Sequence, residues 1–481
     1  MAFDSILNKI FNLFILRRME GINQFIEHPI ETQQRVLFSL LSQAKNTEYG
    51  KLHHFEEIKS YEDFNKQIPI VSYEDFEPFI EKARQGNPDV FWPGKIKHFA
   101  KSSGTTNAKS KFIPISDESL QNCHYKAGKD LLAIYINNHK DSNLFKFKNL
   151  RLGGSAELYE SFGTKFGDLS AILIENLPFW VERTPTPSRE VSLMSEWETK
   201  LKAIVSEVKN KDVGSLTGVP SWMMVLLQRV LKDAGKKSIS EIWPNLEVFF
   251  HGGISFVPYR EQYKQLIGKD IRYYEIYNAS EGFFGIQDRF GSDEMLLMLD
   301  YGIFYEFIPM DTFGTENAKA VSLENVELGK NYAVVITTNG GLWRYLIGDT
   351  IRFTDLKPFR FKISGRTKHY INAFGEELMI DNVETALSKA CQETNAKITD
   401  YTGAPVYMKD GESGSHEWVI EFSTEPNDFG RFSEIFDETL KSLNSDYEAK
   451  RYNNMTLKPP IIHKARTNLF YDWMASRGKL G

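Results

Sequence analysis

The central part of the chain alternates apolar strands with helical stretches, and this pattern constrains the fold more than any other feature. Strands are expected where the sequence reads LEVFF (246–250), RYYEIY (272–277), MLLML (295–299), FYEFI (304–308) and YAVVITT (332–338). One amphipathic helix face before them comprises Trp197, Leu201, Ile204, Val205 and Val208. Several strands end in loops that bear glycine or serine. The pattern is that of an α/β protein, in which ligands bind in loops beyond the carboxyl ends of the strands.

The pattern changes on both sides of this region. The first hundred residues are expected to be helical, with an apolar stripe formed by Val36, Leu37, Leu40, Leu41 and Ala44. After residue 364, helices are expected around 380–390 and 432–440, and strands near 404–408, 416–422 and 455–463. We therefore predict a large N-terminal domain of mixed sheets and helices at 1–364 and a small α+β domain at 365–481.

Composition and charge narrow the class of protein. The chain has 481 residues and a formal net charge of −6, whereas proteins that bind nucleic acid over a broad surface carry a basic excess. No stretch of about 20 uninterrupted apolar residues occurs, so no membrane span is expected. The two cysteines, Cys123 and Cys391, are far apart in sequence, which favours a reducing cytoplasm over a disulfide framework. A monomer is expected.

A loop rich in hydroxyl groups is the first candidate site. Residues 100–116 read AKSSGTTNAKSKFIPIS, and the hydroxyl-bearing run comprises Ser102, Ser103, Gly104, Thr105 and Thr106. Gly104 lets consecutive backbone N–H groups converge on an anion, and Lys109 or Lys111 can add a positive charge. The Walker phosphate-loop string is absent from the chain. A polar surface turn before the strand KFIPI explains this segment alone equally well.

A double-glycine turn is the second candidate. In FFHGGISF (249–256) a strand ends in Gly252 and Gly253, so a flat ring or a ribose can lie against bare backbone. Ser255 is a poor nucleophile candidate, because Val257 stands where a nucleophile elbow requires glycine. The alternative interpretation is an ordinary strand-to-helix turn.

A third strand runs into the loop of YEIYNASEGFFG (274–285). Tyr277 can stack on a base, and Glu281 beside Ser280 can hold a magnesium ion, which prefers a few hard oxygen ligands plus phosphate. The alternative is a helix N-cap at Ser280 with Glu281 in the first turn.

The segment GGLWRYLIGDTIRF (340–353) places Asp349 directly after Gly348 between two apolar stretches. A carboxylate there can accept hydrogen bonds from both hydroxyls of a ribose. The alternative is a hairpin turn, which Gly-Asp also suits.

Taken in order, these segments resemble a known superfamily. SSGTT, a double-glycine turn, Tyr-x-x-Ser-Glu-Gly, Tyr-x-x-Gly-Asp and Gly-Arg-Thr-Lys before a small C-terminal domain resemble the adenylate-forming acyl ligases and luciferase. The strings EYGKLHHFEEIKSYEDFNKQIPIVSYEDFEPFIE (48–81), FAKSSGTTNAKSKFIPIS, HGGISF, YNASEGFFGIQ and RYLIGDTIRF are similar to those of bacterial members of the auxin-responsive promoter (Gretchen Hagen) family of acyl-acid amido synthetases. The resemblance runs from about residue 20 to the end.

The resemblance implies an activity. Family members use ATP and Mg²⁺ to adenylate a small carboxylic acid, then transfer the acyl group to the amine of an amino acid, which yields an amide, AMP and pyrophosphate. Residues 1–364 would then be the adenylate-forming domain. The small domain would rotate between the two steps about a hinge at about 364–375.

The resemblance also implies roles for individual residues. The catalytic set would be Ser102, Ser103, Thr105, Thr106, Lys111 and Glu281. The nucleotide-binding set would be Gly104, Gly252, Gly253, Tyr277, Ser280, Asp349 and Arg366. Tyr277 would face adenine, Asp349 would bind the ribose hydroxyls and Ser280 would touch the α-phosphate. Arg366 would reach the ribose or phosphate, and Glu281 would be the magnesium ligand.

The C-terminus departs from the family pattern. Members carry a lysine in a loop near the C-terminus that reaches the adenylation site, and this chain stops at SRGKLG (476–481). Either the sequence is truncated or Lys479 takes that place. A chain of this length is expected to adenylate weakly or not at all.

Two other functions compete with amide synthesis. An acyl-CoA ligase would share the adenylation step but form a thioester with coenzyme A, and a non-catalytic homologue would bind the nucleotide without using it. A metalloprotease is disfavoured, because His416-Glu417 is not followed by the second histidine of a His-Glu-x-x-His site.

Overall fold

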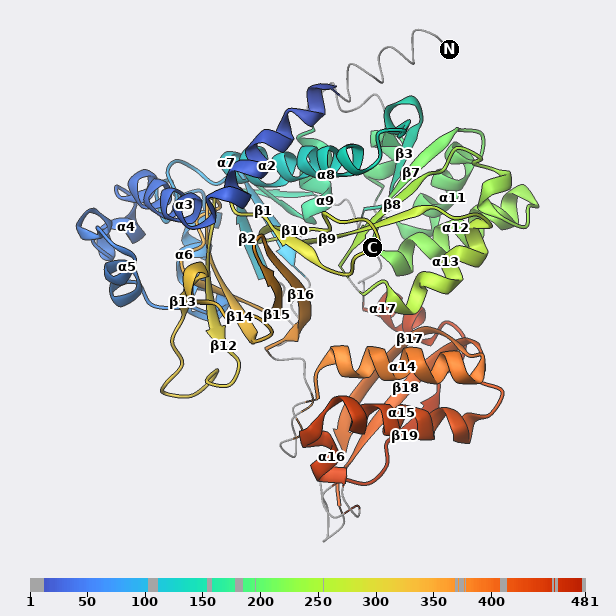
Figure 1. Ribbon diagram of the computed structural model, residues 1–481. Helices are drawn as coiled ribbons and strands as arrows, with labels where there is room; N and C mark the ends of the chain where they lie inside the picture. Colours follow the sequence, from blue (N-terminus) through green and yellow to red (C-terminus); the bar gives the residue numbers. More distant parts are fainter. Residues whose placement is uncertain are drawn as a thin grey trace.

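The computed structural model describes residues 13–102, 111–153, 158–177, 185–194, 196–253, 255–367, 371, 376, 378–406, 413–451, 454 and 457–477. A main body of sheets and helices is followed by a smaller α+β unit, built from the last part of the chain, that packs beneath it (Figure 1). The α/β class predicted from the sequence, with a small C-terminal α+β part, is confirmed.

Among the described residues, twelve strands form one sheet in the order β13-β12-β14-β15-β16-β11-β10-β9-β8-β7-β3-β6. One half is parallel: β3 (Lys148–Arg151), β6 (Pro185–Thr186), β7 (Val213–Gly218), β8 (Val248–Gly252) and β9 (Arg272–Ala279). The other half is antiparallel: β10 (Gly282–Ile286), β11 (Met295–Leu297), β12 (Ile303–Pro309), β13 (Val321–Ser322), β14 (Asn331–Thr338), β15 (Tyr345–Leu356) and β16 (Phe359–Arg366). All five predicted strands fall in this sheet, and its direction changes between β9 and β10.

Helices cover both faces of the parallel half, because its strands are apolar on both sides. Phe249 of β8 belongs to the core shared with α11 (Trp197–Val208), α12 (Pro220–Ala234) and α13 (Arg260–Ile267). Its neighbours Val248 and Phe250 belong to the opposite core, which includes α8 (Tyr125–Asn138). The apolar face predicted for α11 is confirmed, since Leu201, Ile204, Val205 and Val208 are buried.

The N-terminal region is helical, as predicted. It comprises α2 (Arg18–Glu27), α3 (Pro29–Ala44), α4 (Glu48–Leu52), the 3-10 turn η1 (Phe55–Glu57), α5 (Tyr61–Gln67) and α6 (Tyr73–Arg84). Leu37, Leu40, Leu41 and Ala44 of the predicted stripe are buried. Two equivalent capping boxes, Ser60 with Asp63 and Ser72 with Asp75, begin α5 and α6.

A smaller sheet lies beside the main one. Its strand order is β2-β1-β5-β4, with β1 (His98–Ser102), β2 (Lys111–Ile115), β4 (Tyr159–Ser161) and β5 (Thr164–Gly167). The short helices α7 (Asp117–Ser119), α9 (Leu169–Glu175) and α10 (Arg189–Ser192), the 3-10 turns η3 (Leu144–Lys146), η5 (Ile239–Glu241), η6 (Val257–Tyr259) and η7 (Leu323–Asn325), and the π-helical turn η2 (Leu120–His124) complete the body.

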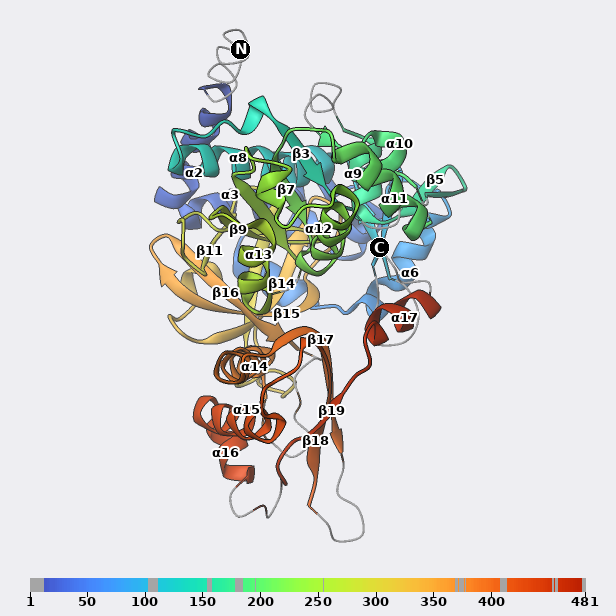
Figure 2. The same cartoon turned by 90° about the vertical axis from the view of Figure 1, so that its right-hand side faces the viewer.

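The C-terminal unit has its own core. Helices α14 (Ile380–Thr394), α15 (Phe429–Leu443) and α16 (Ser445–Arg451) lie on one face of the sheet β17 (Lys397–Val406), β18 (Ser415–Thr424) and β19 (Ile461–Lys464) (Figure 2). The last helix, α17 (Leu469–Ser476), returns to the main body, where the Tyr471 hydroxyl donates to Glu198 of α11. A second contact joins Gln262 of α13 to the carbonyl of Ile398 at 2.9 Å. The division at 364 and the hinge at 364–375 stay predictions.

Candidate active site

Ser280 and Glu281 form a tight turn between two strands of the large sheet. β9 and β10 pair antiparallel, with Ala279 opposite Gly282, so these two residues connect the strands directly. The helix N-cap considered for Ser280 is therefore wrong, because no helix begins there. The turn lies at the point where the sheet changes direction, and Asp349 of β15 and Arg366 of β16 are near enough to influence the pKa of Glu281.

Asp349 lies inside strand β15, which runs unbroken from Tyr345 to Leu356. The hairpin turn considered for Gly-Asp is therefore wrong. Gly348 keeps the strand continuous with a φ of +90°, a left-handed conformation that glycine adopts without strain. A register shift follows between Thr350 and Ile351, so the strand pairing is irregular directly after Asp349.

Two side chains from other strands hold the Asp349 carboxylate. The Tyr277 hydroxyl of β9 donates to Oδ2 at 2.5 Å, and Arg366 Nε of β16 donates to Oδ1 at 2.8 Å. Arg366 is the cross-strand partner of Asp349. Burial, together with the Asp349 carboxylate, raises the pKa of Tyr277, so its hydroxyl stays a donor. The structure thus brings three of the predicted nucleotide-binding residues together.

Glu281 belongs to the same cluster of charges. The pKa of its carboxyl is raised to about 7: burial raises it most and the nearby Asp349 adds to this, while a backbone hydrogen bond, Lys111 and Arg366 lower it. Lys111 begins β2, and its ammonium lies 5.4 Å from the centre of the Tyr73 ring. A carboxyl that changes charge near neutral pH beside two cations is typical of a functional site.

Of the predicted phosphate loop and the lysine after it, the structure describes Ser102 and Lys111. Ser102 ends β1 and is the cross-strand partner of Lys111 in β2. Ser103, Gly104, Thr105 and Thr106 lie outside the described residues, as do Lys109 and Lys479. Ser102 and Lys111 thus lie opposite each other, and Lys111 is near enough to Glu281 to lower the pKa of that carboxyl.

Gly252 is required by the sheet itself. It is the partner of Ile276 in the parallel pair β8–β9, and a Cβ at Gly252 would lie 2.4 Å from the Ile276 carbonyl oxygen. Gly253 follows at the strand end with a φ of +85°. A 3-10 turn and α13 come next, so the strand-to-helix turn considered for this segment is also present.

Tyr345 is a site residue that sequence reasoning missed. Its side chain is 1% exposed, and its hydroxyl has no hydrogen-bond partner in the described part of the chain. Burial raises the pKa of this hydroxyl, and Glu281 is the charge that adds most to the shift. Tyr345 is the first residue of the Tyr-x-x-Gly-Asp string, so that motif could have indicated it as a candidate.

These groups fit a nucleotide. Asp349 offers two acceptor oxygens for ribose hydroxyls, Lys111 and Arg366 offer positive charge for phosphates, and Tyr345 offers a buried donor that lacks an acceptor. In the described ranges no group of three His, Cys, Asp or Glu side chains could hold a metal. Magnesium would therefore depend on Glu281 together with phosphate oxygens.

The fold and this cluster of charged and tyrosyl side chains define an adenylate-forming protein. The solved structure of the GH3.15 acyl acid amido synthetase has the same fold, with a TM-score of 0.78 and 17% identity, over 97% of this chain and 92% of that one. A 2-hydroxyisobutyryl-CoA ligase in its postadenylation state matches less closely, with a TM-score of 0.55 and 14% identity, over 94% and 85% of the two chains.

Within that class the chain belongs to the GH3 family. Its N-terminal, central and C-terminal family domains match residues 18–271, 296–366 and 381–481. An indole-3-acetic acid-amido synthetase of Arabidopsis thaliana, GH3.2, is 23% identical over 80% of this chain and 83% of its own length. The resemblance drawn from the motifs is confirmed at the level of the family. Within the described ranges, no helix has the length and apolar character needed to cross a membrane.

Proposed function

We propose that this protein is an ATP-dependent acyl-acid amido synthetase, a ligase that forms a C–N bond through an acyl-adenylate. One observation carries the proposal: Tyr277, Asp349 and Arg366, from three strands, converge beside Glu281 and Lys111. Membership of the GH3 family supports amide synthesis, because the relatives named above are amido synthetases.

The chemistry suits these residues. A carboxylate is a poor acyl donor, and joining it to the α-phosphate of ATP turns AMP into the leaving group. The protein therefore has to position the reactants and stabilise charge, and it needs no covalent bond between the substrate and a side chain. Asp349 would hold the ribose and Tyr277 would face adenine. Lys111, Arg366 and the phosphate loop would hold the phosphates.

Magnesium would be held by Glu281, whose carboxyl must lose its proton to bind the ion. Ser280 would contact the α-phosphate from the same turn. Residues 365–481 would act as a second domain that rotates between adenylation and transfer about the hinge at 364–375. The motif strings support the bacterial branch of the family, and the two free cysteines, Cys123 and Cys391, support a cytoplasmic location. The protein would act as a monomer.

The test is pyrophosphate release with ATP and Mg²⁺ across a panel of carboxylic acids, with and without pooled amino acids. Release that requires an acid and increases with amino acids supports the proposal and identifies the substrate class. Release that requires coenzyme A instead supports the acyl-CoA ligase. ATP binding without release under any condition supports the non-catalytic homologue.

A further inference from the structure

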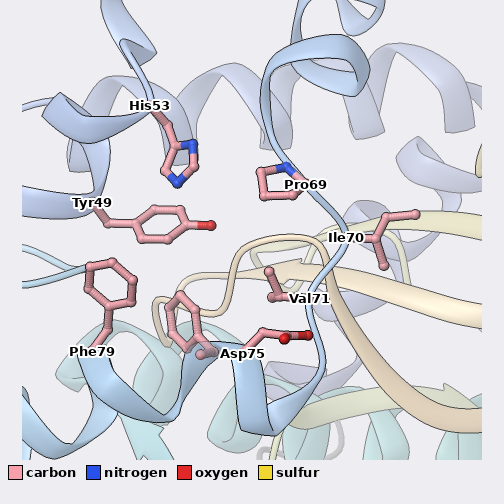
Figure 3. Close-up of a pocket in the computed structure, with 8 residues that line it drawn as sticks. Tyr49, His53, Pro69, Ile70, Val71, Asp75 and Phe79 are labelled. Carbon is pink, nitrogen blue, oxygen red and sulfur yellow. The ribbon is translucent and has the colours of Figure 1, made fainter.

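A pocket lies in the N-terminal helical region, and its lining residue Val71 forms a bridge with Tyr345 of β15. Its volume is about 400 Å³, and it is lined by Tyr49, His53, Pro69, Ile70, Val71, Asp75, Phe76 and Phe79. These residues come from α4 and the residue after it, from α6, and from the segment that joins α5 to α6 (Figure 3). None of them has a role in the proposed adenylation chemistry, so the pocket needs a separate explanation.

The Tyr49 hydroxyl is the feature that points to a ligand. The side chain is 2% exposed, and the hydroxyl has no hydrogen-bond partner in the described part of the chain. It is directed into the space between His53, Pro69 and Val71 (Figure 3). Burial raises its pKa, so the group stays protonated and acts as a donor. A buried donor without an acceptor is costly, and a ligand oxygen would satisfy it.

Aromatic rings form one wall of the pocket. The Tyr49 ring meets the rings of Phe76 and Phe79 edge-to-face, with centroids 5.3 Å and 5.1 Å apart. Ile70 and Val71 add aliphatic surface on the other side. Rings held by edge-to-face contacts have little freedom to collapse into the space, so the wall is preformed for a flat apolar group.

Asp75 gives the pocket a negative charge. Its Oδ2 accepts from the backbone N and the hydroxyl of Ser72, both at 2.8 Å, and these bonds lower the pKa of the carboxyl. Oδ1 accepts no hydrogen bond from any described residue. The imidazole of His53 cannot balance this charge at neutral pH, because burial lowers its pKa. The pocket thus combines one anion, one buried donor and an aromatic wall.

We propose that this pocket binds a small aromatic amine that carries an oxygen on or near its ring. The ring would pack against Tyr49, Phe76 and Phe79, its oxygen would accept from the Tyr49 hydroxyl, and its ammonium group would pair with Asp75. The inference does not depend on the proposed enzyme activity, since the pocket and the active site share no residue.

The test is isothermal titration calorimetry of the full chain with tyramine as the probe. Phenethylamine lacks the ring oxygen, and the neutral 4-ethylphenol lacks the amine, so the pair separates the two polar contacts. Saturable binding of tyramine that weakens about fivefold for phenethylamine supports the Tyr49 contact. Absence of saturable tyramine binding at millimolar concentration overturns the proposal.

Variants locate the binding. Asp75→Asn is expected to weaken tyramine binding about tenfold or more. Asp63→Asn is the matched control, because Asp63 has the same capping-box role at the start of α5 and does not line the pocket. Tyr49→Phe should weaken tyramine binding about fivefold without lowering the melting temperature, since the hydroxyl has no bond to lose. Binding that is equal in Asp75→Asn and Asp63→Asn overturns the proposal.

Discussion

Two clusters in this protein each contain one tyrosine, one carboxylate and one arginine. They differ in how far their polar groups are hydrogen-bonded and enclosed within the protein. The buried cluster consists of Tyr61, Glu306 and Arg344. The side chains of Arg344 and Glu306 are 3% and 1% exposed. Arg344 donates to both Glu306 oxygens, at 2.8 and 2.9 Å, and to the carbonyls of Asn65 and Ile68. The hydrogen bonds of Arg344 are thus made to other groups of the protein.

The site cluster consists of Tyr277, Asp349 and Arg366. Its carboxylate is 15% exposed and its arginine is 46% exposed. Among the described residues Arg366 pairs with Asp349 through Nε, and about half of its side chain is exposed. The same three chemical groups therefore serve the fold when they are enclosed, and can serve a ligand when one of them stays accessible.

Removing the arginine should have the largest effect on stability in the buried cluster. Arg344→Met would leave the Glu306 carboxyl enclosed without its partner, at a cost of about 3–5 kcal/mol of unfolding free energy. Arg366→Met is the matched variant and should cost about 1 kcal/mol or less, because Arg366 is half exposed. Urea denaturation measures both. Equal losses in the two variants would contradict the distinction.

Removing the Glu281 carboxylate should have the largest effect on catalysis. Glu281→Gln keeps the shape of the side chain and loses the charge that would hold magnesium, so we expect acid-dependent pyrophosphate release to fall about 100-fold or more. The melting temperature should not fall, because a neutral amide resembles the protonated carboxyl. A rate close to that of the unmodified protein would remove Glu281 from the metal site.

The same carboxyl predicts a pH dependence. The pKa of Glu281 is raised to about 7, so below that pH the group is protonated and competes poorly for Mg²⁺. Apparent Mg²⁺ affinity should increase about tenfold per pH unit from pH 5 to 7 and then level off. Glu281→Gln should remove this slope. A Mg²⁺ affinity that does not change with pH in the unmodified protein would be inconsistent with a pKa near 7 for Glu281.

The smallest contrast is expected between the two tyrosines. Tyr61→Phe removes a 3.0 Å hydrogen bond to the enclosed Glu306 and should cost about 2 kcal/mol of unfolding free energy. Tyr277→Phe should cost about 1 kcal/mol, because Asp349 keeps Arg366 and has access to solvent. Thermal unfolding by calorimetry compares the two. A larger loss of unfolding free energy for Tyr277→Phe than for Tyr61→Phe would contradict the distinction between the two clusters.

Much of the fold was predictable from the sequence, because strands and helices each carry a periodic apolar pattern. The five predicted strands overlap β8, β9, β11, β12 and β14, although β8 begins two residues later and β11 ends two residues earlier than predicted. The β17 prediction was less accurate: a strand near 404–408 was expected, and the strand runs from Lys397 to Val406. The first residues of β17 include many polar ones, so the apolar pattern gave little indication of a strand there.

The candidate site was predictable in its members and not in its geometry. Order along the chain pointed to Tyr277, Glu281 and Asp349, yet each had an equally ordinary local explanation. The pairing of the strands distinguishes these explanations: β15 pairs with β16, in the same sheet as β9. The buried role of Arg344, five residues before Asp349, was not predictable, because exposure depends on contacts with α5 and β12.

The central claim is that Asp349 holds the ribose of ATP, and the most direct test is ATP affinity by isothermal titration calorimetry. Asp349→Asn should weaken binding at least about tenfold, with a loss of unfolding free energy no larger than that of Arg366→Met. Asp355→Asn is the matched control, because Asp355 lies on the same strand and pairs with Arg360 at 3.0 Å. Its ATP affinity should equal that of the unmodified protein. An Asp349→Asn variant that binds ATP as tightly as the unmodified protein would contradict the account.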